Sequence, residues 1–114
     1  MANADYVPDR GDFVRIVFDP RVGREQSGER PGLVLSERAF NALTGYVFIA
    51  PVTSTRRDWP FEVPIPLGCK VSGVVLADQT KSIDHVARHV RFIAAAPAGL
   101  AEAVLERVAA ILSF

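Results

Sequence analysis

Four side chains that could carry phosphate or acid–base chemistry flank two apolar segments of the sequence. Glu25, Glu29 and Arg30 lie in the polar stretch EQSGERP, directly before the apolar run GLVLS, and Thr53 comes near the end of YVFIAPVTS. An arginine beside a hydroxyl can bind a phosphate, and a nearby carboxylate can transfer a proton. Alternatively, Arg30 only pairs with Glu25 or Glu29, which is common for charges in a loop. The residues alone leave both interpretations open.

Four further residues are weaker candidates. His85 and His89 have the spacing of a helical zinc pair, but a third ligand is not apparent and the segment also fits a turn before a strand. We therefore predict ordinary histidines and no bound metal. Cys69 lies in a turn without an obvious histidine partner and is predicted to be structural. Trp59 either stacks on a base or packs at a sheet edge, and we predict packing.

Short strands must position these residues. Asp12–Phe18 alternates like a strand with one strongly apolar face, whereas polar, glycine-bearing residues from Pro20 to about Arg30 predict a long loop. Pro31 begins the next strand and pushes the backbone of Arg30 toward extended geometry. The other predicted strands are Gly32–Ser36, Gly45–Ser54, a proline-bearing edge strand over Phe61–Leu67, Gly73–Gln79 and Ala87–Ile93.

Two helices complete the prediction. Residues 37–45 predict about one helical turn, with Ser36 as its N-cap and Gly45 at its end. Pro97 lies near the start of a C-terminal helix whose apolar residues recur at helical spacing: Leu100, Val104, Val108 and Ile111, with Leu112 beside them. We predict a single domain over residues 1–114 of the mainly β (α+β) class, a small barrel or curled sheet with a helix packed on it.

Composition and charge restrict the partners. Thirteen Lys and Arg residues balance thirteen Asp and Glu residues, so no global positive field attracts nucleic acid or an anionic membrane, and any anion site must be local. The single cysteine excludes an internal disulfide. No apolar run approaches the roughly 20 residues that a bilayer span needs, and the N-terminus lacks a signal-peptide pattern. We expect a cytoplasmic protein without membrane association.

Five segments, in this order and at these spacings, resemble the MazF/PemK family of toxin endoribonucleases: YVPDRGDFVRIVFDP, VGREQSGERPGLVLS, PVTS, WPFEV and GVVLADQTKSID. The resemblance covers Tyr6 to about Arg88. It implies an SH3-like, PemK-type β-barrel with a C-terminal helix, a homodimer, and metal-independent cleavage of single-stranded RNA without a cofactor.

The resemblance also implies partners and a biological role. The protein would be the toxin of a type II toxin–antitoxin system and would inhibit translation and growth by cutting RNA, with mRNA, tRNA and rRNA all open as targets. A cognate antitoxin protein with an acidic tail would inhibit it. Operator DNA would be contacted only through the antitoxin complex.

Roles carry over to matching positions. Arg30 matches the arginine of the family's GxRP element, and we expect it to act as a cation at the developing charge, with proton transfer to the leaving oxygen as a further role. Thr53 matches the threonine of PVT and would hold a phosphate oxygen. Glu25 would orient Arg30 or accept the 2′-OH proton, or be a structural partner only. The implied RNA contacts are Gln26, Ser54, Lys81 and Arg88.

One departure and two alternatives accompany this interpretation. Glu29 places an acid directly beside Arg30, where the family often has a neutral or basic residue. A protein-binding toxin on the same barrel, similar to the CcdB gyrase poisons, would cleave nothing and would need neither Arg30 nor Thr53 at these positions. A copy that only binds antitoxin is the third interpretation.

Overall fold

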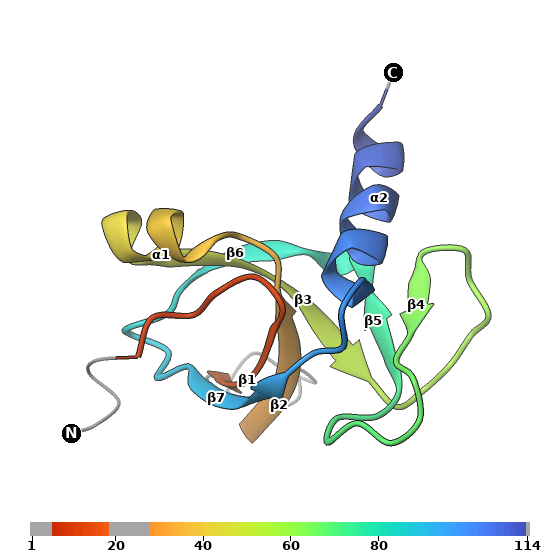
Figure 1. The fold of residues 1–114 in the computed structure, drawn as a ribbon, viewed down its shortest axis with the longest axis horizontal. Coiled ribbons are helices and arrows are strands. Elements are labelled where there is room, and N and C mark those ends of the chain that lie inside the picture. The colour runs from red at the N-terminus through yellow and green to blue at the C-terminus, as the bar shows by residue number, and fades with distance from the viewer. Residues whose placement is uncertain (1–5, 19–27, 114) are drawn as a thin grey trace.

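The structure, a computed structural model, describes residues 6–18 and 28–113, which form seven strands, two α-helices and one short 3-10 helix (Figure 1). In chain order these elements are β1 (Asp12–Phe18), β2 (Gly28–Val34), α1 (Arg38–Thr44), β3 (Tyr46–Thr53), β4 (Glu62–Pro64), β5 (Val74–Leu76), the 3-10 helix η2 (Ala77–Gln79), β6 (Lys81–Asp84), β7 (Arg91–Ala95) and α2 (Leu100–Leu112).

The strands form one antiparallel sheet in the order β4-β5-β3-β2-β1-β7, and β6 pairs with the first half of β3. In the described part of the chain this sheet ends at β4 and β7 and does not close into a ring. The predicted class, a mainly β fold with a C-terminal helix, is confirmed. The barrel is an open, curled one.

Alternation along the strands creates two apolar clusters on opposite faces. On one face, which we call the helix core, side chains of β1, β2 and β3 pack against α2; its largest members include Phe13, Leu33, Val52, Leu100 and Val104. On the other face lies the second core, formed by Val14, Ile16, Val34, Val47, Ile49, Ile83 and Val90. The sheet therefore buries apolar side chains on both faces.

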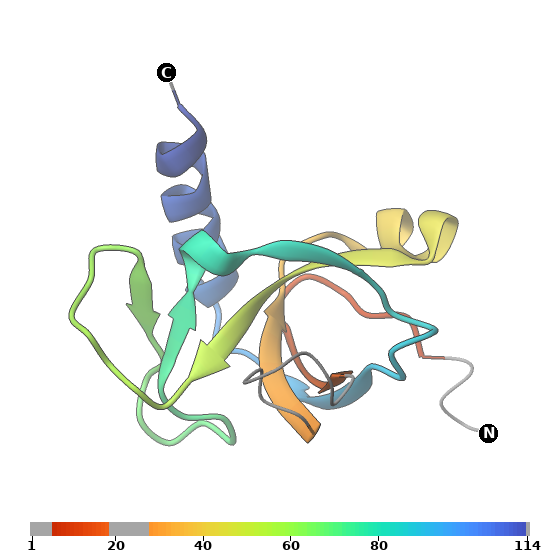
Figure 2. The ribbon, with the colours of Figure 1, turned by 180° about the vertical axis from the view of Figure 1, so that it is seen from behind.

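Helix α2 packs against the helix core from Leu100 to Val108, and its last turn does not. Leu100 and Val104 are buried, whereas Ile111 and Leu112 are 42% and 64% exposed. Both views show the C-terminal end of α2 projecting away from the strands (Figures 1 and 2). The predicted helix is confirmed, and the last part of its apolar stripe lies at the surface of this chain.

Strand β2 begins earlier than predicted. Its first residues, Gly28 to Arg30, pair with Ile16 to Phe18 of β1, so they belong to the sheet and not to the predicted loop. Pro31 therefore lies inside the strand. Its missing N–H is tolerated because, in the described chain, the pairing of β2 with β3 begins only at Gly32.

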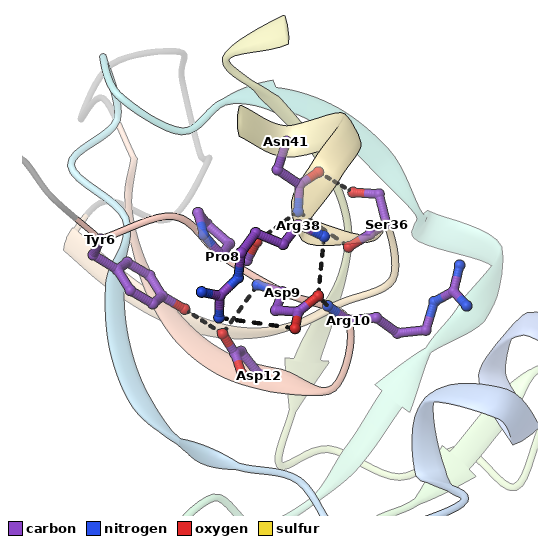
Figure 3. A network of polar contacts seen from close by, with 8 residues as sticks. All are labelled: Tyr6, Pro8, Asp9, Arg10, Asp12, Ser36, Arg38 and Asn41. Atoms are coloured by element: carbon purple, nitrogen blue, oxygen red, sulfur yellow. Dashed lines mark hydrogen bonds and ion pairs between the residues drawn. The ribbon is translucent and has the colours of Figure 1, made fainter. Parts of the chain in front are cut away.

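Helix α1 is confirmed, but its N-terminal cap differs from the prediction. Asp9 accepts a hydrogen bond from the backbone N–H of Arg38 at 2.9 Å, and the Ser36 hydroxyl instead donates to Oδ1 of Asn41 at 2.6 Å (Figure 3). Gly45 ends the helix with φ of 78°, as predicted. The acceptor for the first helical N–H group thus comes from a residue 29 positions earlier in the chain.

The segment before β1 is tied to α1 by further polar contacts. The fully buried Asn41 donates to the Pro8 carbonyl at 2.8 Å, and the Tyr6 hydroxyl donates to Asp12 at 2.7 Å (Figure 3). Burial, and then the hydrogen bond to Asp12, raise the pKa of Tyr6 well above its ordinary value. This network fixes α1 against residues 6–12, at the opposite end of the molecule from β4 and β5 (Figure 1).

Candidate functional site

Arg30 and Thr53 lie on the same face of the sheet. Gly32 of β2 pairs with Pro51 of β3. Residues two apart on a strand share a face, and so do directly paired residues. Arg30 lies two residues before Gly32, and Thr53 lies two residues after Pro51. Arg30 and Thr53 therefore share a face of the sheet, and the same register, continued by two residues, would place them opposite each other. Sequence reasoning proposed that these two residues converge, and the strand register supplies the reason.

Lys81 extends this face across the next strand. It pairs with Ile49 of β3, which lies four residues before Thr53, or about 13 Å of strand length. Lys81 therefore also lies on the face of the second core. Ser54 directly follows Thr53 and is exposed.

Burial falls along each strand toward these residues. On β2 the side chains change from the fully buried Val34 to the half-buried Arg30, and on β3 from the fully buried Ile49 to the half-buried Thr53. On β6 they change from the buried Ile83 to the exposed Lys81. We call this edge of the second core, defined by Arg30, Thr53 and Lys81, the polar rim. Side chains here can reach a solvent-borne ligand while their backbones remain in the sheet.

Two contacts fix Thr53. Its Oγ1 accepts a hydrogen bond from the Thr55 backbone N–H at 3.2 Å, so the hydroxyl hydrogen is available to donate elsewhere. On the other side, Gly73 approaches so closely that a Cβ added there would lie 2.2 Å from the Thr53 carbonyl oxygen and 3.2 Å from Cα of Ser54. Sequence reasoning missed Gly73, which it placed only as the first residue of a strand.

Gly73→Ala is expected to destabilise the fold by about 2 kcal/mol or more, because Gly73 has a φ of 116° and the new methyl group clashes with backbone. Urea unfolding would measure this cost. Gly68→Ala is the matched control, since Gly68 has a φ of 93° but nothing within 4 Å of an added Cβ. Equal costs for the two variants would contradict a close approach at Thr53.

The remaining implied contacts are not gathered at the polar rim. Arg88 is half-buried in the turn after β6, and its N–H donates to the Asp84 carbonyl at 3.1 Å. Asp84 pairs with Tyr46, about 23 Å of strand length from Thr53. Glu25 and Gln26 lie outside the described residues.

The four weaker candidates differ in their surroundings. Residues 85–89 form a turn rather than a helix, and the buried His85 contacts the Asn41 carbonyl through Nε2 at 3.0 Å. Within residues 6–18 and 28–113, no three His, Cys, Asp or Glu side chains are grouped to hold a metal ion. Cys69 packs against the helix core as predicted, whereas Trp59, predicted to pack, is 53% exposed.

Comparison with known proteins places these observations in a family. The family model described as "PemK-like, MazF-like toxin of type II toxin-antitoxin system" matches residues 9–112. The endoribonuclease toxin MazF of Escherichia coli strain K12 is 47% identical over 83 residues, covering 73% of this chain and 74% of that protein. The endoribonuclease toxin ChpB of the same strain is 39% identical over 109 residues, covering 91% of this chain and 93% of that protein.

Solved structures agree with the sequence relatives. The crystal structure of MazF from Deinococcus radiodurans has a TM-score of 0.86 and 44% identity, covering 96% of this chain and all of that chain. A MazE–MazF crystal structure from the same organism also has a TM-score of 0.86, with 41% identity over 96% and 99% of the two chains. The chain therefore belongs to the PemK-like, MazF-like family of type II toxin–antitoxin toxins and is an endoribonuclease toxin of that family.

Proposed function

We propose that this toxin cleaves single-stranded RNA at short sequences, without a metal ion, at the polar rim. The observation that carries the proposal is the register that brings Arg30 and Thr53 onto one face, half-buried, where the paired parts of β2 and β3 end. A cation and a hydroxyl donor at one place suit a phosphodiester. The names of the relatives, endoribonucleases MazF and ChpB, support RNA as the substrate.

The reaction needs two proton transfers and one stabilised charge. The ribose 2′-oxygen attacks the adjacent phosphorus and loses its proton, the bond from phosphorus to the 5′-oxygen breaks, and that oxygen gains a proton. The products are a 2′,3′-cyclic phosphate and a 5′-hydroxyl end. Arg30 stabilises the charge on the phosphate and supplies the proton that the leaving 5′-oxygen gains, and Thr53 donates to a phosphate oxygen. Glu25 accepts the 2′-OH proton or orients Arg30.

The other implied residues contact the RNA away from the reacting atoms. Lys81, on the polar rim, and Ser54, directly after Thr53, are exposed and bind backbone phosphates. Gln26 contacts the RNA from the segment before β2. Arg88 contacts an extended substrate, because its turn is anchored at the far end of β3.

The proposed partners follow the relatives. The MazE–MazF complex from Deinococcus radiodurans supports a cognate antitoxin for this chain. We infer a homodimer as well, and the exposed apolar side chains at the end of α2, Ile111 and Leu112, offer surface for an interface. Neither helix of the described residues has the length and apolar character to cross a bilayer. A cytoplasmic location completes the proposal.

The deciding experiment incubates the purified protein with a long single-stranded RNA in EDTA and maps the new 5′ ends. Cleavage at a short recurring sequence is expected, with 5′-hydroxyl ends. A matched oligonucleotide with one 2′-deoxy nucleotide at the mapped site should resist cleavage, because the nucleophile is missing. RNA left intact at every protein concentration would refute the nuclease, and inhibition of gyrase by that inactive protein would support the CcdB-like alternative.

A further inference from the structure

The loop Thr55–Pro60, between β3 and β4, is held in one conformation by a buried carboxylate. Glu62 of β4 is only 8% exposed, and its Oε1 accepts hydrogen bonds from the backbone N–H groups of Arg57 at 3.0 Å and Asp58 at 3.2 Å. Its Oε2 lies 3.2 Å from the Arg57 nitrogen. Burying a carboxylate costs free energy unless the carboxylate is hydrogen-bonded. The loop conformation that keeps these N–H groups on Glu62 is therefore favoured over others.

Both ends of the loop are fastened as well. At the start, the Thr55 N–H donates to the hydroxyl of Thr53. At the end, Nε of Arg107, on α2, donates to the Pro60 carbonyl at 3.0 Å. The loop is therefore attached to the polar rim on one side and to the C-terminal helix on the other.

The backbone inside the loop adopts a conformation that needs such support. Asp58 has a φ of 59°, in the left-handed region that a non-glycine residue adopts at a cost. The next residue is Trp59, whose carbonyl accepts from the Glu62 N–H at 3.1 Å. The backbone conformation of Asp58 and the hydrogen bonds of Glu62 thus set the direction in which the Trp59 side chain projects from the loop.

The side chains that this loop presents to solvent suit single-stranded RNA. Trp59 is 53% exposed, and the adjacent Arg56 and Arg57 are exposed cations. Protein aromatic side chains stack on unpaired bases, and neighbouring cations hold the phosphates. A tryptophan this exposed would otherwise leave a large apolar area in water.

We propose that Glu62 is a positioning residue that holds the loop so that Trp59 stacks on an RNA base next to the cleaved bond, which makes Trp59 a determinant of the sequence that is cut. The inference rests on the proposed nuclease function. Thr53 links the proposed cleavage site to the loop, because the hydroxyl that we assign to the phosphate also accepts the hydrogen bond that anchors the start of the loop.

Stacking can be read directly, because Trp59 is the only tryptophan in the chain. The probe is the oligonucleotide with a single 2′-deoxy nucleotide at the mapped cleavage site, which binds without being cut. Titration should quench the tryptophan fluorescence in parallel with binding, followed independently through a dye on the oligonucleotide. Saturated binding with unchanged tryptophan fluorescence would overturn the stacking role.

The positioning role predicts a graded series of variants. Trp59→Ala and Glu62→Leu should each raise KM about 10-fold or more, with a smaller change in kcat and a broader set of cleaved sequences. Glu62→Gln should remain close to the wild type, because one oxygen at the Oε1 position can accept from both N–H groups. Leu43→Ala, which truncates an 86% exposed apolar side chain on α1, is the control.

Normal KM and unchanged cleavage sites in Trp59→Ala, with circular dichroism showing that the variant is folded, would overturn the proposal. Fluorescence anisotropy of Trp59 without RNA tests the positioning role separately. Glu62→Leu should lower the anisotropy and Glu62→Gln should not, and equal values for all three proteins would refute positioning by Glu62. If the wild type cleaves no RNA, the stacking role fails with the proposed function, but this RNA-free measurement still decides whether Glu62 holds the loop.

Discussion

Replacing Arg30 with alanine is expected to abolish RNA cleavage, with a loss of about 10³-fold or more in kcat, and to leave the fold intact. One positioned donor to a developing oxyanion contributes about 10²- to 10³-fold, and the guanidinium adds a full charge in a half-buried place. The strand itself depends on backbone pairing with β1, which alanine preserves. Single-turnover cleavage in EDTA and circular dichroism measure the two effects.

Two further variants sharpen this result. Arg30→Lys keeps the charge but loses the forked, planar contact, so an intermediate rate is expected. Arg38→Ala removes an exposed arginine of α1 whose ion pair with Asp9 is 3.8 Å long, and it should cleave at the normal rate. An Arg30→Ala protein within a few-fold of the wild type would remove Arg30 from the catalytic site.

Thr53→Ala is expected to reduce cleavage about 10²-fold or more, because it removes one donor aimed at a phosphate oxygen. The variant also removes the acceptor for the Thr55 N–H, so some of the loss reflects a looser loop. Thr53→Ser retains the hydroxyl and should recover most of the rate. The kinetics of all three proteins on one short RNA would separate the contributions.

Thr44→Ala is the matched control for this series. Its hydroxyl donates to the Phe40 carbonyl at 2.9 Å on α1, at the opposite end of β3 from Thr53. It should show a normal rate and a small loss of stability. If Thr53→Ala also cleaved normally, Thr53 would have a structural role only.

The elements with a clear pattern were predictable from sequence. β1 alternates, β3 is a long apolar run ending at Thr53, and β4 lies at the sheet edge as its prolines require. The fold class and the grouping of Arg30 with Thr53 followed from such local signals together with the family motifs. The C-terminal helix was equally clear from its spacing.

Other elements depend on contacts that the sequence does not reveal. β6 (KSID) has one buried apolar residue, Ile83, and is a strand because it pairs with β3. The predicted strand Ala87–Ile93 was wrong in its first half, because residues 85–89 form a turn with His89 at a φ of 53°. The predicted strand Gly73–Gln79 is shorter than expected, since η2 follows after Leu76.

The supporting residues of the candidate site were also hidden. Glu62 lies within the predicted edge strand Phe61–Leu67, and nothing in the sequence indicates that the loop before it covers its carboxylate. Asp9 caps a helix that begins 29 residues later. Such roles depend on which segments meet in space, and no local spacing encodes them.

The position of β1 in the middle of the sheet determines when, during synthesis of the chain, the sheet around the site can be completed. β1 is translated well before one of its two neighbours, β7, and Arg107, which fastens the loop to α2, comes later still. At roughly 5–20 residues per second, several seconds separate the synthesis of Arg30 from that of β7. A chain that has been synthesised only as far as β6 therefore lacks both the neighbour of β1 and the arginine that fastens the loop, so the supports of the site are complete only after Arg107 has been made.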